Sequence, residues 1–342
     1  MTSPSFADRL VAAWYEPGLS WLTAALLPLS WLFRAVVALR RSLYRMGILR
    51  AERVRVPVIV VGNISVGGVG KTPLVCALAH ALRARGWQPG IVARGYGGSN
   101  RAPRVVQVDD DPEVVGDEPL LLAATGCPVW IGSARPAAAR GLLAAHPECD
   151  VIIADDGLQH YALAREVEIA VVDANRGLGN GRMLPAGPLR EPHSRMEEAD
   201  FVVRLVAAHV ARPSAGHARE TLMTLQPHPW RNLVRPDAIA DQDLWRGREV
   251  HALAGIGNPR RFFDSVQALG VDAVEHAFPD HHAYAAQDLA FPDAAAIVMT
   301  EKDAVKCSSF AGANCWFMSI RAHIDDALVT LIEGKLRGSQ AA

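Results

Sequence analysis

The sequence predicts a doubly wound α/β fold with a mostly parallel sheet, followed by a second, smaller α/β domain and preceded by an apolar helix. Short β-branched runs alternate with helical segments, as in parallel sheets that are covered by helices on both faces. The alternation stops at residues 226–231, Gln-Pro-His-Pro-Trp-Arg, and then resumes. We therefore expect an N-terminal helix within residues 1–45, a larger α/β domain over 46–228 and a smaller one over 229–342.

The composition is that of an ordinary globular protein, with 50% of the residues hydrophobic and 21% charged. The formal net charge of −1 gives no global basic field, so we expect no nucleic-acid partner. The five cysteines are scattered and form no Cys-x-x-Cys pair. This excludes a disulfide framework and a thiolate zinc site, and it fits a reducing cytosol.

Residues 17–33 contain no charged side chain. The run is shorter than the roughly 20 apolar residues that a transmembrane helix needs, and Pro28 lies inside it. A signal peptide needs a basic start and a small-residue cleavage site, whereas Asp8 and Glu16 precede this run. A helix that lies in the membrane surface therefore explains the run better than either alternative.

An arginine-rich block follows the apolar run. Seven arginines stand between residues 34 and 55, against one acid, Glu52. Such a block can bind anionic lipid headgroups, with tryptophans 14, 21 and 31 at headgroup depth. The alternative is a helix buried against the protein's own core. Periodicity does not separate the two, because the helix is apolar on nearly all sides.

The strands and helices of the two α/β domains can be placed from the same pattern. In the larger domain we expect strands at residues 54–61, 90–93, 151–154 and 169–173, and a helix from about 72 to 85. In the smaller domain we expect strands at 250–255, 296–300 and 315–320, and a helix that starts after Asn258 and ends at Gly270. The segment from Gly255 to Gly257 lacks the third glycine of a dinucleotide fingerprint, which argues against NAD binding.

A glycine-rich segment between the first strand and its helix is the strongest signal in the chain. It reads Ser65, Val66, Gly67, Gly68, Val69, Gly70, Lys71, Thr72. Glycines let the backbone wrap phosphates, toward which the N–H groups of the helix start then point. In such a loop Lys71 bridges the β- and γ-phosphates and the Thr72 hydroxyl holds Mg²⁺. The usual pattern begins with glycine, but Ser65 stands there, so we expect the chain to enter this nucleotide site with a different geometry.

Asp155 and Asp156 follow an apolar strand and precede Gly157. This is where a second magnesium-holding acid belongs, although a solvated turn would also place acids there. Successive residues of an extended chain point in opposite directions, so we expect one acid to serve the metal and the other the scaffold. Guanine specificity is unsupported, because Lys302 and Asp303 are adjacent rather than spaced as in Asn-Lys-x-Asp.

Eight motifs extend this interpretation. They are Gly62-Asn63, Gly67 to Pro73, Arg94-Gly-Tyr-Gly-Gly98, Gly116-Asp-Glu-Pro119, Asp155-Asp-Gly-Leu-Gln-His160, Pro185-Ala-Gly-Pro-Leu-Arg-Glu-Pro192, Phe278-Pro-Asp-His281 and Thr300 to Lys306. In this order the sequence resembles the tetraacyldisaccharide 4′-kinase family, the lipid A 4′-kinases of Gram-negative bacteria. The match runs from the apolar helix to about residue 306.

The resemblance implies a two-domain α/β P-loop kinase on the cytoplasmic face of the bacterial inner membrane. With ATP and Mg²⁺ it would phosphorylate the 4′-hydroxyl of a tetraacylated glucosamine disaccharide 1-phosphate. We expect a lipid substrate, a membrane surface with anionic lipids and no protein partner. Two alternatives are a P-loop kinase of a soluble sugar or nucleoside and a membrane-recruited ATPase switch. A candidate base in the 116–119 motif and the second α/β domain favour a kinase over the switch.

The resemblance also assigns roles. Lys71 and Thr72 would act in the phosphate loop, and Asp117 would be the general base, assisted by His281. Asp155, Asp156 and Glu191 would be the acids of the magnesium site. Active-site or substrate contacts would come from Arg94, Tyr96, Arg135, Gln159, His160 and Arg190. Physical chemistry agrees, because a hydroxyl that attacks phosphorus needs positioning, charge neutralisation and a proton acceptor. A helix cap is the alternative role for Asp117.

Overall fold

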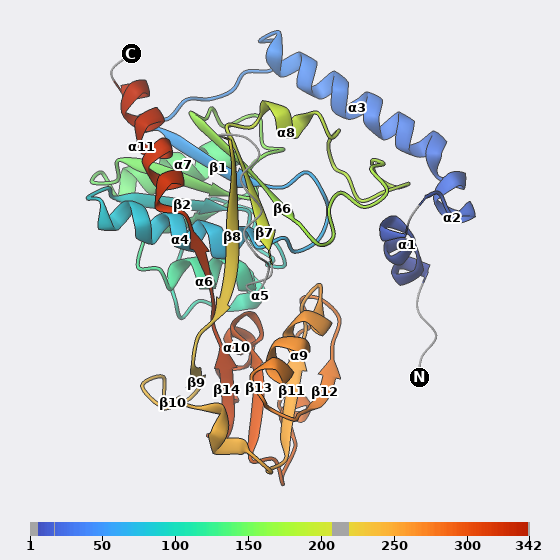
Figure 1. The fold of residues 1–342 in the computed structure, drawn as a ribbon. Coiled ribbons are helices and arrows are strands. Elements are labelled where there is room, and N and C mark those ends of the chain that lie inside the picture. The colour runs from blue at the N-terminus through green and yellow to red at the C-terminus, as the bar shows by residue number, and fades with distance from the viewer. Residues whose placement is uncertain (1–5, 17, 207–218, 341–342) are drawn as a thin grey trace.

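The computed structural model describes residues 6–16, 18–206 and 219–340. These form two units, each built on one sheet, with a set of N-terminal helices beside the larger unit (Figure 1). Both sheets are mostly parallel, as the alternation of strands and helices predicts. The mixed α/β class is therefore confirmed.

The larger sheet has nine strands in the order β15-β8-β7-β6-β1-β5-β2-β4-β3. Its two edge strands run antiparallel to their neighbours and all other pairs are parallel. The strands are β1 (Val58–Gly62), β2 (Pro89–Ala93), β3 (Arg104–Val106), β4 (Val129–Ile131), β5 (Val151–Asp155), β6 (Val167–Asp173), β7 (Phe201–Val206), β8 (Glu220–Pro227) and β15 (Ile320–Ile324). The first strand starts at Val58, four residues later than the run 54–61 predicts.

Two apolar cores lie on the two faces of this sheet. Successive residues of β1 alternate between them: Ile59 and Val61 belong to one core, Val58 and Val60 to the other. The first core is covered by α4 (Lys71–Ala84), α6 (Asp117–Ala123) and α11 (Asp326–Gln340), and the second by α7 (Arg135–Ala145). Short helices α5 (Pro112–Val115) and α8 (Arg195–Glu198) lie in the connections.

The smaller unit contains a six-stranded sheet in the order β10-β9-β14-β13-β11-β12. Its strands are β9 (Trp230–Asn232), β10 (Ile239–Ala240), β11 (Val250–Ala254), β12 (Val274–Ala277), β13 (Ala296–Thr300) and β14 (Cys315–Met318). Helix α9 (Pro259–Ala268) packs on one face of this sheet and α10 (Glu301–Cys307) on the other. Two 3₁₀ turns, η1 (Gln242–Trp245) and η2 (Ala286–Leu289), complete the unit.

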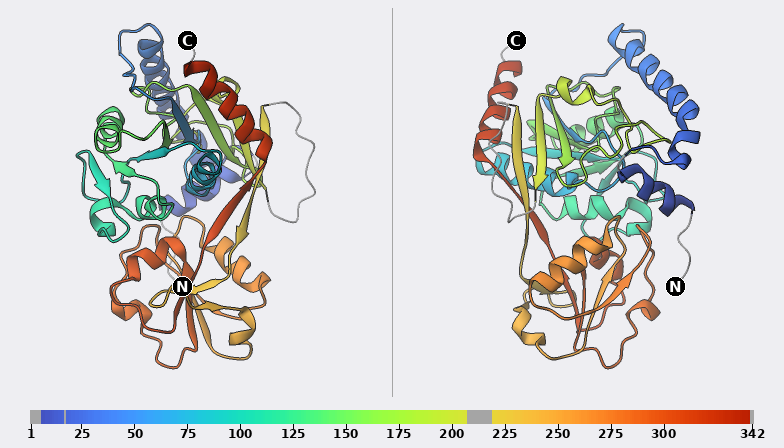
Figure 2. Two further views of the ribbon diagram at one scale, coloured as in Figure 1. Left: turned by 90° about the vertical axis from the view of Figure 1, so that its left-hand side faces the viewer. Right: turned by 45° about the vertical axis from the view of Figure 1, so that its right-hand side comes forward.

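The chain returns to the larger unit at its C-terminal end. The run 315–320, predicted as one strand, is divided between β14 of the small sheet and β15 of the large one. β15 pairs antiparallel with β8, and α11 follows it onto the first core (Figures 1 and 2). The expected smaller domain over 229–342 therefore differs from the structure, because its last 20 or so residues complete the larger sheet. The sequence pattern of residues 315–320 does not reveal this division, because the run is almost continuously apolar and the chain passes from one sheet to the other at Ser319.

Three helices form the N-terminal region: α1 (Phe6–Tyr15), α2 (Trp21–Ala25) and α3 (Leu27–Arg45). Pro28 starts α3 rather than interrupting a helix, since a proline in the first turn loses no hydrogen bond. Among the described residues, no helix combines the length and the hydropathy that crossing a bilayer requires. Trp14, expected at headgroup depth, is instead 7% exposed, and its indole N–H donates to the carbonyl of Pro185 at 3.0 Å.

The arginine block is also partly committed to the protein itself. Arg41 and Arg45 of α3 both pair with Glu198 of α8. Arg53 pairs with Glu166, and Arg55 donates to two backbone carbonyls near the end of α7. These four of the seven arginines have partners within the protein, so the expected contact of the block with lipid headgroups stays a prediction.

The C-terminal helix offers a direct test of the chain's return. Ile332 of α11 is fully buried in the first core, and Leu331 beside it is 51% exposed. We expect Ile332→Ala to lower the free energy of unfolding by about 2–5 kcal/mol, the usual range for an aliphatic side chain cut back in a core. The matched control Leu331→Ala should change it by no more than about 0.5 kcal/mol. Equal losses in urea denaturation would contradict the packing of α11 described above.

Candidate active site

The candidate site lies at the carboxyl ends of β1 and β5, where loops of a parallel sheet meet. The segment 63–70 leaves β1 and reaches α4, with Gly67 at φ +100° and Gly70 at φ +85°, values that favour glycine. A Cβ on Gly62 would lie 2.8 Å from Cγ of Leu158. Ser65 forms an antiparallel bridge with Leu189. Position 65 does not need a glycine, because Ser65 is paired with Leu189 in a bridge. The close approach of the backbone to Leu158, which does need a glycine, occurs at Gly62.

Lys71 is the first residue of α4 and faces acceptors on both sides. Its ammonium donates to Oδ1 of Asn63 at 3.1 Å and lies 3.3 Å from Oδ1 of Asp156. Asn63 is fully buried, and its side-chain amide also reaches the carbonyl of Gly67 at 3.5 Å. The lysine is therefore held over the phosphate loop rather than extended into solvent.

Asp155 and Asp156 have opposite environments, as their adjacency predicts. Asp155 is 4% exposed, and its Oδ2 accepts from the Thr72 hydroxyl at 3.3 Å. Burial raises the pKa of Asp155 to about 7, and the charge of Glu118 adds to the rise. Burial also acts to raise the pKa of Asp156, but Lys71 and Arg190 outweigh it and the net pKa is lowered. Arg190 lies 3.1 Å from Oδ2 of Asp156.

The surroundings of Asp155 fit a divalent cation. Its Oδ1 is buried without a hydrogen-bond partner in the described part of the chain. The described residues contain no cluster of three or more His, Cys, Asp or Glu arranged as a complete metal site. Mg²⁺ suits this donor set, because it is usually held by one or two carboxylates together with substrate phosphates and water. The Thr72 hydroxyl and the Asp155 carboxylate are the protein ligands that this geometry offers.

Glu191 has a different environment from the one the resemblance implies. It is 1% exposed and accepts from Gln159 Nε2 at 2.9 Å and from the Tyr161 hydroxyl at 2.7 Å, and it pairs with Arg195 at 3.2 Å. Gln159 also donates to the carbonyl of Asn63 at 3.0 Å. Two hydrogen-bond donors and the charge of Arg195 satisfy Glu191, so its environment favours bracing the phosphate loop over holding a metal.

The remaining expected contact residues surround the same strand ends. Arg135 is 1% exposed and donates to the carbonyls of Gly132 at 2.8 Å and Asp155 at 3.3 Å. Burial lowers its pKa to about 10. Burial, reinforced by the charges of Arg135 and Arg94, lowers the pKa of His160 to about 4, which makes it neutral at neutral pH. Arg135 is thus part of the scaffold, while Arg94 stays exposed.

Asp117 and His281 come from different units and meet beside this cluster. Asp117 starts α6 and is 3% exposed, and its Oδ2 lies 3.0 Å from Nδ1 of His281, in the loop after β12. Tyr96, 60% exposed, sets the edge of its ring against His281 with centroids 5.1 Å apart. His281 has φ +59° and Asp156 φ +49°, the two left-handed non-glycine residues of the described chain. Such backbone strain is common at functional sites.

The charges around this pair set its protonation. Burial acts to raise the pKa of Asp117, but the His281 hydrogen bond and the charges of Lys302 and Lys306 lower it below its usual range. The same hydrogen bond raises the pKa of His281 against burial and Lys302. Asp117 is therefore an ionised carboxylate over the physiological range. Its Oδ1 also accepts from the N–H of Glu118 at 2.9 Å within the first turn of α6, whose N-cap is Gly116.

Sequence reasoning gave no role to two lysines of α10. Lys302 lies 3.8 Å from Asp117, 3.3 Å from Glu118 and 3.6 Å from Asp280, and so connects the two units. Lys306, one turn later on the same helix face, lies 4.0 Å from Asp117 and 2.8 Å from Asp303. The signal was available, because positively charged residues at positions i and i+4 of a helix share one face.

Together these residues can bind a polyphosphate with a divalent cation and take a proton from a hydroxyl group. Comparison with known proteins points the same way. A family model described as tetraacyldisaccharide-1-P 4′-kinase matches residues 22–337. A tetraacyldisaccharide 4′-kinase from Methylobacillus flagellatus is similar at 48% identity over 333 residues, covering 97% of each chain. Another from Azoarcus sp. is 51% identical over 313 residues, covering 91% of each chain.

A solved structure is also similar. A crystal structure of LpxK from Aquifex aeolicus in complex with ATP superimposes with a TM-score of 0.78 and 29% identity. The match covers 92% of this chain and 99% of that one. The similarity therefore includes both units and not the phosphate loop alone.

The coupling of Asp117 and His281 can be measured directly. In the wild type, we expect NMR titration to give His281 a pKa above its ordinary value of about 6.5, because the Asp117 carboxylate stabilises the imidazolium. Asp117→Asn removes that charge and leaves burial and Lys302 opposed only by Asp280, so the pKa of His281 should fall relative to the wild type. The control Asp237→Asn, an exposed carboxylate in the smaller unit, should leave it unchanged. An unshifted His281 in Asp117→Asn would mean that the two side chains do not interact in solution.

Proposed function

This chain belongs to the tetraacyldisaccharide 4′-kinase family, and we propose that the residues gathered at the ends of β1 and β5 carry out the family's reaction. That reaction transfers the γ-phosphate of ATP to the 4′-hydroxyl of a tetraacylated disaccharide 1-phosphate. We prefer this function to the two alternatives, a kinase of a soluble sugar or nucleoside and an ATPase switch. The main support for the proposal is the contact of Asp117 with His281 at 3.0 Å, because it brings a candidate base of the larger unit together with a histidine of the second unit.

The phosphate loop supplies positioning and charge. Its backbone N–H groups would bind the β- and γ-phosphates, and Lys71 would move from Asn63 and Asp156 to the phosphate oxygens. Mg²⁺, held by Thr72 and Asp155, would neutralise charge on the phosphates. Arg190 and Asp156 would orient Lys71 and the sugar. Gln159, held by Glu191, would fix the entry of the loop through its bond to the carbonyl of Asn63.

Asp117 would receive the proton of the attacking hydroxyl. Its lowered pKa keeps it ionised and able to accept, and His281 donates through Nδ1 to fix its orientation. A strong base is unnecessary, because the transition state of phosphoryl transfer is loose and the hydroxyl loses its proton late. Tyr96, exposed beside His281, and Arg94 would contact the sugar.

A double-mutant cycle tests this assignment. In an assay with labelled ATP and a lipid extract, we expect Asp117→Asn to lower kcat by about 10² to 10⁴, the usual contribution of a general base. His281→Ala should cost less, and it should add little to Asp117→Asn because the pair acts as a unit. The control His323→Ala, exposed on β15, should retain activity. Multiplication of the two defects would return Asp117 to the role of a helix cap.

We further propose that α2 and α3 bind the membrane surface, where a substrate with four acyl chains resides. Four exposed apolar residues form one stripe of α3 at helical spacing: Leu29, Leu32, Val36 and Leu39. The opposite side of α3 is attached to the protein, since Ser30 donates to the carbonyl of Met183 at 2.7 Å and Phe33 and Val37 pack against the second core. Trp21 of α2 is 83% exposed. The helix would therefore lie in the interface with its exposed stripe in lipid.

Replacing the outer stripe separates membrane binding from folding. We expect the triple variant Leu32→Gln, Val36→Gln, Leu39→Gln to lose most of its co-sedimentation with liposomes, because these side chains contribute apolar insertion that salt does not screen. ATP binding should be retained, since the stripe faces away from the phosphate loop. A matched triple in the smaller unit, Val234→Gln, Ile239→Gln, Leu244→Gln, replaces side chains of similar exposure and should bind liposomes as the wild type does. Equal binding by all three proteins would refute the membrane assignment of α3.

A further inference from the structure

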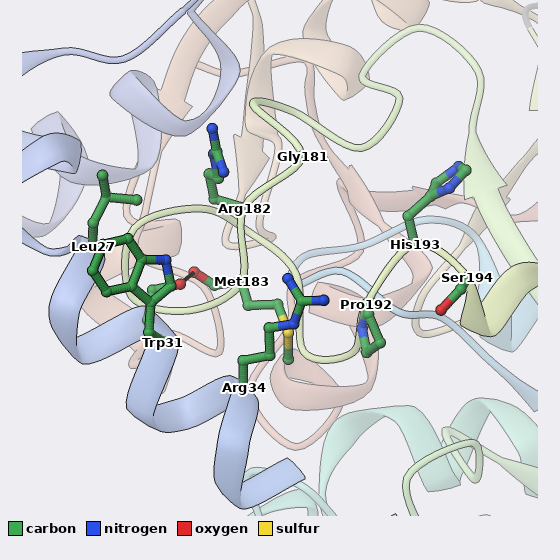
Figure 3. Close-up of a pocket in the computed structure, with 10 residues that line it drawn as sticks. Leu27, Trp31, Arg34, Gly181, Arg182, Met183, Pro192, His193 and Ser194 are labelled. Atoms are coloured by element: carbon green, nitrogen blue, oxygen red, sulfur yellow. Dashed lines mark hydrogen bonds between the residues drawn. The ribbon is translucent and has the colours of Figure 1, made fainter. Parts of the chain in front are cut away.

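A cavity of about 290 Å³ lies between α3 and two loops that lead into the active site. Figure 3 shows Leu27, Trp31 and Arg34 of α3 on one side, and the loop residues His193 and Ser194 on the other. The loop that carries Arg182 and Met183 completes the lining. Pockets for small molecules usually measure about 300–1,000 Å³. This one has room for a phosphate and the carbons next to it, but not for acyl chains.

The cavity is positively charged without a counter-charge. Its lining residues include Arg34, Arg182 and His193, and no Asp or Glu is among them. Within the described residues, neither guanidinium group has a hydrogen bond or an ion pair. On the same helix, Arg41 and Arg45 pair with Glu198. Two unpaired cations that share a cavity attract an anion more strongly than separate surface arginines do.

The position of the cavity links the membrane surface to the chemistry. Trp31, 62% exposed, lines the cavity and lies on the same helix as the apolar stripe. Pro192 lines the opposite wall and is the second residue after Arg190, which pairs with Asp156. Ser30 fixes the shape of the cavity through its bond to Met183. An anion bound here would lie at headgroup depth, beside the active site rather than in it.

We propose that this cavity binds the phosphate ester of a membrane lipid, with Arg34 and Arg182 as its cations and the Ser194 hydroxyl as a neutral donor. The proposal rests on the kinase function proposed above. Arginine suits this role because its planar fork donates two parallel bonds to phosphate oxygens. The phosphate can come from two sources: the 1-phosphate of the disaccharide substrate itself or the headgroup of a surrounding phospholipid.

Two assays on full-length protein distinguish the sources. The variants are Arg34→Gln and Arg182→Gln, and the matched control is Arg50→Gln, an exposed arginine just beyond α3 that does not line the cavity. One assay measures phosphorylation in neutral detergent micelles, with the disaccharide 1-phosphate and with the same disaccharide lacking that phosphate. The other measures co-sedimentation with phosphatidylcholine vesicles, with and without phosphatidylglycerol.

If the site takes the substrate's 1-phosphate, each cavity variant raises KM about fivefold for the phosphorylated disaccharide only. If it takes a phospholipid headgroup, each lowers binding to phosphatidylglycerol vesicles about fivefold and leaves KM in neutral micelles unchanged. The proposal is overturned if the cavity variants match the wild type in both assays, or if Arg50→Gln gives the same losses. Failure of the kinase function would appear in the wild type, which would phosphorylate neither disaccharide, while the vesicle assay would still report on the cavity.

Discussion

A carboxylate buried at the end of β5 constrains the rest of the site. Asp155 is 4% exposed, and burying an ionised group costs several kcal/mol unless opposite charge compensates it. Its pKa of about 7 records that cost. The Thr72 hydroxyl and the nearby charges of Lys71 and Arg135 compensate it in part, and its second oxygen stays without a partner among the described residues. The site is therefore preorganised for a cation, because a bound cation would relieve a penalty that folding has already imposed.

The second constraint is the contact between the two units. The pair Asp117–His281 and the contacts of Lys302 with Asp117 and Glu118 all cross from one unit to the other. His281 holds φ +59°, a conformation that costs of order 1–3 kcal/mol for a residue other than glycine. Gly97 lies beside the histidine ring at φ +83°, a conformation that favours glycine. The candidate site is thus built from both units, and a change in their separation would move the Asp117 carboxylate away from His281.

The local pattern of the sequence was sufficient for the class of fold and for the phosphate loop, since glycine positions and strand-helix alternation are properties of short segments. The same is true of Asp155 and Asp156, whose adjacency implied opposite orientations. The features that the sequence did not reveal depend on contacts between residues far apart in the chain. Trp14 reads as a surface tryptophan until Pro185 is brought beside it, and the run 315–320 reads as one strand until its two halves join different sheets. The surroundings of Glu191 are likewise not visible locally, because it accepts from Gln159 and Tyr161 and pairs with Arg195, which no local pattern connects to it.

Helix α3 is coupled to the phosphate loop by consecutive polar contacts and not by apolar packing alone. Glu198 pairs with Arg41 and Arg45 of α3 and lies 3.9 Å from Arg195. Arg195 is 3% exposed and also pairs with Glu168 and with Glu191. Glu191 accepts from Gln159, which donates to the carbonyl of Asn63 at the entry of the loop.

The two ends of this network differ in strength. The exposed pair of Arg45 with Glu198 is worth about 0–1 kcal/mol, and salt weakens it. Arg195 is buried, and removing one partner of a buried pair costs about 3–5 kcal/mol because the other charge is left uncompensated. Deformation of α3 would therefore break the outer pairs first, while the inner contacts keep the phosphate loop in place. On the proposed membrane surface, such an arrangement would let the helix adapt without disturbing the residues proposed to bind phosphate.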